Sequence, residues 1–151
     1  MSEMLGNQYF LARKFVQAAR ELEKALLKRP ASKKIRRKLI ICHLQSGEMN
    51  RAIELFVPLI EENIDTIAKS DPMFDDCPCP EIIYDLEKQA RIYQDLFSYN
   101  LKLGILWLYC DVDKSIHYFR MSEKSNPENT LIKKIISLLQ EYQLKHEQVS
   151  R

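Results

Sequence analysis

Three ten-residue segments of the chain align with one another without gaps. They are Arg13–Leu22, Gly47–Phe56 and Cys110–Phe119, and the first two begin 34 residues apart. Each segment holds a small residue followed four positions later by a large apolar one: Ala18 and Leu22, Ala52 and Phe56, Ser115 and Phe119. A small side chain lets two helices approach closely, and the large one fills the space beside it. The spacing therefore predicts stacked helical hairpins.

The composition agrees with such a fold. The chain is 46% hydrophobic and 29% charged, which is typical of a folded domain and too apolar for a disordered one. Only three glycines and six prolines occur in 151 residues, so tight turns are few. We therefore expect an all-α protein.

The first copy resembles the tetratricopeptide repeat. Residues fall at the family's signature positions and end in a helix-terminating proline: Leu5, Gly6, Tyr9, Ala18, Leu22, Ala25 and Pro30. A second copy, at about 33–66, keeps Leu39, Ala52, Ile53 and Phe56. A third, at about 96–129, keeps Ser115, Phe119 and Pro127, with Trp107 in its first helix. The resemblance implies an α–α superhelix of helical hairpins that binds other proteins.

The copies predict the order of segments along the chain. Residues 1–65 hold two repeats, and 66–80 form an acidic loop with proline and cysteine. Residues 81–129 hold a long helix and the third repeat. The lack of a breaker between 81 and 110 allows one helix of about thirty residues there, with two helices as the alternative. Residues 130–146 carry an apolar stripe that predicts a capping helix, with a dimerisation helix as the alternative, and 147–151 form a tail.

Charge is divided along the chain. Residues 1–40 hold 11 Lys and Arg against 3 Asp and Glu, whereas residues 41–97 hold 4 against 12. This division predicts a dipolar molecule. The basic stretch 28–38 has three interpretations: contact with a nucleic-acid backbone, a solvated helix face, or attraction to the acidic middle of a second copy in a homo-oligomer.

The cysteines are the other candidates for chemistry. Cys77 and Cys79 follow two aspartates, and such a loop can hold zinc or act in redox chemistry. A structural zinc site usually needs four ligands, however, so a loop with two thiols and no metal is the favoured interpretation. There is no export signal and no apolar run long enough to span a membrane. We therefore expect a cytoplasmic protein with four reduced cysteines, no membrane contact and no cofactor.

No catalytic motif is present, neither a glycine-rich phosphate loop nor a nucleophile elbow, so the chain is not expected to be an enzyme. In tetratricopeptide domains the first helix of each pair lines a concave groove. The resemblance implies a groove of Asn7, Phe10, Lys34, Arg37, Ile41, Gln45, Asn100 and Trp107. Lys34, Arg37 and Lys38 make this groove positive, which predicts an acidic protein or peptide ligand. The expected role is that of an adaptor, chaperone or assembly factor, with a nucleic-acid-associated regulator as the alternative.

Overall fold

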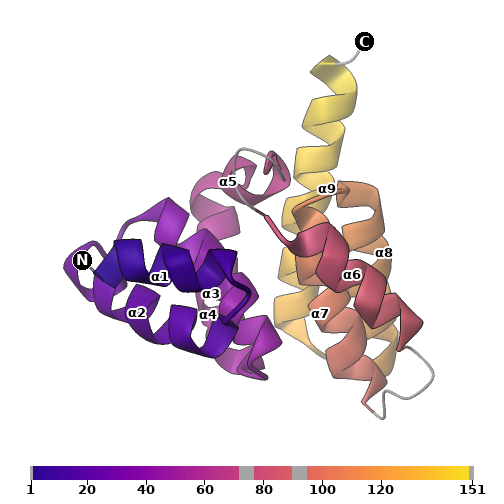
Figure 1. Ribbon diagram of the computed structural model, residues 1–151. Coiled ribbons are helices and arrows are strands. Elements are labelled where there is room, and N and C mark those ends of the chain that lie inside the picture. Colours follow the sequence, from indigo (N-terminus) through magenta and orange to yellow (C-terminus); the bar gives the residue numbers. More distant parts are fainter. Residues whose placement is uncertain (1, 72–76, 90–94, 150–151) are drawn as a thin grey trace. The chain divides into compact units, whose positions relative to one another are not determined.

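The computed structural model describes residues 2–71, 77–89 and 95–149, the last three of these without their side chains. The described residues form helices α1 to α9 and no strand, which confirms the prediction of an all-α fold (Figure 1). The chain divides into two compact units, Met1–Thr66 (unit 1) and Ile67–Arg151 (unit 2). None of the described helices is long and apolar enough to cross a membrane.

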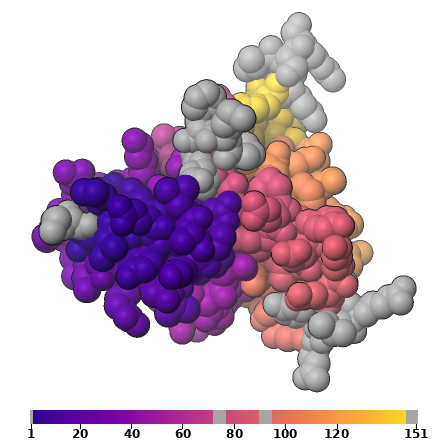
Figure 2. All heavy atoms as spheres, in the orientation of Figure 1, coloured from indigo at the N-terminus to yellow at the C-terminus, as the bar shows by residue number. Residues whose placement is uncertain are grey.

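Unit 1 consists of two helical hairpins. Its helices are α1 (Ser2–Leu11), α2 (Phe15–Lys28), α3 (Lys33–Gln45) and α4 (Met49–Asn63), and the short α5 (Asp65–Ala68) spans its boundary. Each helix packs on the next, α1 on α2, α2 on α3 and α3 on α4. In the space-filling view the atoms of these neighbouring helices form a continuous surface (Figure 2).

The hairpins of unit 1 depend on small residues at helix crossings. Ala18 and Ala52 are fully buried, which is the environment that the repeat pattern predicted. Gly6 faces Leu22 so closely that a Cβ atom added to Gly6 would lie 2.7 Å from Leu22 Cγ. In the turn between α3 and α4, Gly47 has a φ of 80°, a conformation that glycine adopts without steric cost.

Unit 2 contains α6 (Cys79–Lys88), α7 (Leu96–Leu108), α8 (Val112–Ser125) and α9 (Thr130–Val149). The helices pack in order, α6 on α7, α7 on α8 and α8 on α9. At the crossing of α7 and α8, the Ser115 hydroxyl donates a hydrogen bond to the Gly104 carbonyl at 2.6 Å. A Cβ atom added to Gly104 would lie 3.0 Å from three atoms of the Phe119 ring. The α7–α8 hairpin therefore has the same glycine-to-large-residue contact as α1–α2.

Two helix boundaries differ from the prediction. No single helix runs through 81–110, because α6 ends at Lys88 and α7 begins at Leu96. Asp95 starts α7 by accepting a hydrogen bond from the backbone N–H of Ser98, a helix cap that needs neither glycine nor proline. At the other end of the unit, α9 runs to Val149 and so includes residues that we assigned to the tail.

Candidate functional site

The predicted groove residues of unit 1 come from α1 and α3, which are in contact. Lys38 joins the two helices: its ammonium donates a hydrogen bond to Asn7 Oδ1 at 2.9 Å and lies 5.6 Å from the centre of the Phe10 ring. On α1, Met4 and Leu11 flank Asn7 at helical spacing and are 60% and 58% exposed. We call this surface the α1–α3 face and define it as Met4, Asn7, Leu11, Lys34, Arg37, Lys38 and Gln45.

Two of the predicted groove residues in unit 1 are core residues. Phe10 is 1% exposed and packs edge-on against Phe15, and Ile41 is 2% exposed. Both therefore belong to the core under the face, and a role as ligand contacts stays a prediction. By contrast, Lys34 and Gln45 are exposed. Helical spacing did not indicate how deeply each of these side chains is buried.

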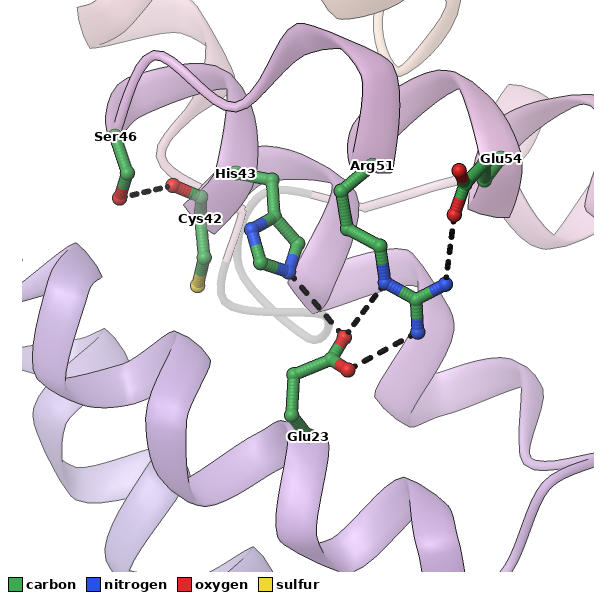
Figure 3. Close-up of polar contacts among 6 residues, drawn as sticks. All are labelled: Glu23, Cys42, His43, Ser46, Arg51 and Glu54. Carbon is green, nitrogen blue, oxygen red and sulfur yellow. Dashed lines mark hydrogen bonds and ion pairs between the residues drawn. The ribbon is translucent and has the colours of Figure 1, made fainter.

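A polar network joins three helices of unit 1, α2, α3 and α4 (Figure 3). Glu23 Oε1 accepts a hydrogen bond from Arg51 Nε at 3.2 Å and lies 3.3 Å from His43 Nε2, while Glu23 Oε2 accepts from Arg51 Nη2 at 3.0 Å. Arg51 Nη1 also donates to Glu54 at 3.2 Å. The hydrogen bonds that Arg51 donates to Glu23, together with the negative charges of Glu23 and Glu54, raise the pKa of Arg51. The guanidinium therefore stays charged and fixes the spacing of α2 and α4.

The basic stretch 28–38 contains a structural arginine. Arg36 is buried, and its guanidinium donates to the carbonyls of Ala31 and Ser32 and to Glu62 at 2.7 Å. These bonds attach the turn between α2 and α3 to α4, and the hydrogen bond from Arg36 lowers the pKa of Glu62. Since Arg36 is satisfied inside the protein, it is not part of the charge that an external ligand meets. The sequence signal for this role is its place beside Ile35 in the apolar stripe of α3.

Most of unit 1, from the last turn of α1 onward, matches a known family. The family model of the tetratricopeptide repeat matches residues 9–68, from the end of α1 to α5. Residues 9–68 are a tetratricopeptide-repeat segment. Such repeats generally mediate protein–protein interaction and are generally not catalytic. No curated protein and no solved structure matches the chain significantly. The third copy, which lies beyond the matched segment, stays a prediction.

The two remaining groove candidates, Asn100 and Trp107, lie in unit 2, outside the repeat segment. Asn100 is buried. The indole N–H of Trp107 donates to Glu87 Oε1 at 3.2 Å, and the Lys114 ammonium lies 4.3 Å from the centre of the indole ring. Tyr118 donates to the same carboxylate oxygen at 3.3 Å, and burial together with the charge of Glu87 raises the pKa of Tyr118 to about 12. Trp107 thus connects α6, α7 and α8, and a role in binding stays a prediction.

The cysteines differ from the expected state. Cys77 and Cys79 form a disulfide, and Cys42 and Cys110 are free, so the prediction of four reduced thiols is wrong for the first pair. Because a disulfide offers no thiolate, this pair is not a zinc site as the structure stands. Among the described residues there is no group of three or more His, Cys, Asp and Glu side chains placed to hold a metal ion.

The two free thiols should differ in reactivity. Burial raises the pKa of Cys42 to about 12, so almost none of it is thiolate at neutral pH. Cys110 is exposed, although desolvation and Asp111 also raise its pKa.

We expect native, non-reduced protein to take up a single maleimide, slowly and at Cys110. Unfolding should add Cys42, and reduction after unfolding should add Cys77 and Cys79. Intact-mass spectrometry with peptide mapping measures each step. Labelling of Cys77 and Cys79 in denaturant without reductant would contradict the disulfide.

Proposed function

We propose that this chain is a protein-interaction module, acting as an adaptor, chaperone or assembly factor, and that its α1–α3 face binds an acidic segment of a partner protein. The observation that carries the proposal is the combination of exposed apolar and basic side chains on the α1–α3 face, which lies partly on the tetratricopeptide-repeat segment 9–68 and partly on the residues of α1 before it. Met4 and Leu11 are exposed on α1, and Lys34 is exposed on α3.

Each part of the face supplies a different contribution to binding. The exposed side chains of Met4 and Leu11 offer apolar area that a partner can remove from water. Lys34 supplies positive charge, and Lys38 is oriented by its hydrogen bond to Asn7. Charge of this kind steers an acidic partner and fixes its orientation more than it adds affinity. A partner segment with acidic residues next to apolar ones is therefore the best complement.

The structure gives less support to the nucleic-acid alternative. Arg36 is buried and bonded to Glu62, and Arg29 Nη1 lies 3.7 Å from Glu3. Two cations of the basic stretch therefore face carboxylates of the same chain. A phosphate backbone is bound by many exposed cations together. The α1–α3 face instead offers a few cations beside apolar side chains, which is a composition suited to a protein segment.

The test combines affinity capture with charge reversal. Immobilised full-length protein is exposed to a lysate of its source cells, and bound proteins are quantified by mass spectrometry. The double variant Lys34→Glu/Arg37→Glu should retain the specific partners at least about tenfold less well, which corresponds to about 1.4 kcal/mol of binding free energy. The double variant Arg20→Glu/Lys28→Glu carries the same charge change on α2, where both residues are exposed, and should retain them like the parent protein.

Two further outcomes decide against the proposal. If both double variants lose the partners equally, net charge rather than the α1–α3 face governs binding. If the parent protein instead retains a random 20-nucleotide strand whose binding collapses between 50 and 200 mM salt (a range over which about 10³- to 10⁵-fold losses are typical of phosphate contacts), the nucleic-acid alternative is correct.

A further inference from the structure

The tetratricopeptide-repeat segment has a pocket between α2 and α4. Its volume is about 360 Å³, within the range of small-ligand sites. The Glu23–Arg51 pair joins α2 to α4, just as the Asn7–Lys38 contact joins α1 to α3. The pocket therefore lies mainly on α2 and α4, whereas the α1–α3 face lies on α1 and α3. It is a separate candidate site.

The walls of the pocket are apolar. They are formed by Leu26 and Leu27 of α2, Leu55 and Pro58 of α4, and Pro30 of the turn that follows α2. Leu27 is 83% exposed, whereas Leu26 and Leu55 are buried. An apolar side chain inserted here would cover Leu27 and contact the two buried leucines. The pocket volume is sufficient for one large side chain.

The two arginine side chains that line the pocket are held by the protein itself. Arg36 is bonded to Glu62 and to two backbone carbonyls, and Arg51 is bonded to Glu23 and Glu54. Because the Arg36–Glu62 and Arg51–Glu23 hydrogen bonds cross between helices, they keep the pocket open and its walls in place. Because both guanidiniums already have carboxylate partners, the pocket has little tendency to attract an anion.

The rim of the pocket offers hydrogen-bond acceptors and negative charge. The Glu54 side chain lines the pocket and is 65% exposed. Pro58 has no N–H, so the Glu54 backbone carbonyl lacks the donor that an α-helix normally supplies. Glu61 is also exposed on α4, whereas Arg36 already balances the charge of Glu62. A ligand that complements this rim carries a cation or other donor.

We propose that the pocket binds a basic amphipathic segment of a partner protein. A large apolar side chain of that segment enters between Leu27 and Pro58, and a lysine or arginine one helical turn away pairs with Glu54. The partner chemistry is thus opposite in charge to that proposed for the α1–α3 face. Two ligands of opposite charge can then bind one repeat segment at separate places.

A matched pair of small probes tests the chemistry of the pocket on the full-length protein. The probes are 4-phenylbutylamine and 4-phenylbutanoate, which share an apolar ring and differ in the sign of their charge. Methyl spectra of leucine-labelled protein should show saturable shifts of Leu26, Leu27 and Leu55. The amine should bind about 3- to 10-fold more tightly than the acid, as expected for one partly exposed charge pair.

Variants assign the effect to named side chains. Glu54→Gln should reduce the preference for the amine to less than about twofold, because it removes the charge and keeps the shape. Leu27→Ala should weaken binding of both probes. The matched controls are Glu128→Gln, at an exposed glutamate of unit 2, and Leu11→Ala, at an exposed leucine of the α1–α3 face. Glu128→Gln should leave the preference for the amine unchanged, and Leu11→Ala should leave the binding of both probes unchanged. Unchanged methyl signals outside the pocket show that each variant is folded.

Three results would overturn the proposal: no saturable shift of the three leucines, equal affinity for amine and acid, or loss of probe binding in Lys34→Glu/Arg37→Glu. Shifts of the same methyl groups on dilution without a probe would assign the pocket to a second copy of this chain instead. Since the probes do not depend on the α1–α3 face, failure here leaves the proposed function standing, and failure of that function leaves this inference standing.

Discussion

Truncation of Phe119 to alanine is expected to lower the free energy of unfolding by about 3–5 kcal/mol. Phe119 is fully buried, and its ring lies against the backbone of Gly104 at the crossing of α7 and α8. Removal of the ring leaves a cavity that two packed helices close only in part. Urea unfolding followed by far-ultraviolet circular dichroism measures the loss. The control is a substitution at exposed His117, two positions before Phe119 on α8. His117→Ala should change the free energy of unfolding by less than about 0.5 kcal/mol.

A second substitution tests whether the crossing itself is correct. Gly104→Ala places a methyl group 3.0 Å from the Phe119 ring, so it should be destabilising in the parent protein. In the Phe119→Ala background the same methyl group enters the cavity, and its cost should disappear. If Gly104→Ala had the same effect in both backgrounds, the two residues would not be in contact and the α7–α8 geometry would be wrong.

This contact also shows where the sequence pattern stopped being sufficient. Sixteen positions separate Gly6 from Leu22, but fifteen separate Gly104 from Phe119. A gapless alignment anchored on Ser115 therefore leaves Gly104 unassigned. A one-residue offset turns a helical register by about 100°, since the helix has 3.6 residues per turn. The alignment assigned Asn100 to the groove, and the structure buries it, as it also buries Leu101 one position later.

Within the repeat segment the sequence was a better guide, since the small residues Ala18 and Ala52 are buried where the pattern required. Periodicity could not predict features that depend on contacts between side chains of different helices. The burial of Arg36 depends on Glu62, 26 residues away, and the pocket depends on α2, α3 and α4 together. The Cys77–Cys79 disulfide was unpredictable for another reason, because a pair of cysteines in a loop does not reveal its redox state.

Gly6→Val is expected to have the other large effect, a loss of about 2–3 kcal/mol of stability. The new Cβ atom would lie 2.7 Å from Leu22 Cγ, 2.8 Å from Leu22 Cδ2 and 3.3 Å from the Leu22 backbone nitrogen. Because Cγ is close to the backbone, rotation of the leucine tip does not relieve the contact, and α1 must move away from α2. Gln8→Val introduces the same β-branched residue at an exposed position of α1 and should cost only its lower helix propensity, less than about 0.7 kcal/mol.

The cost of Gly6→Val should shrink when the obstacle is removed. Leu22→Ala alone creates a cavity and should cost about 2–5 kcal/mol of stability. The double variant Gly6→Val/Leu22→Ala should be more stable, by about 1–3 kcal/mol, than the sum of the two single losses predicts. Since α1 carries Asn7, its displacement should also break the hydrogen bond to Lys38 and weaken binding at the α1–α3 face, and the double variant should restore part of that binding. Strict additivity of the two unfolding free energies would mean that Gly6 does not set the distance between α1 and α2.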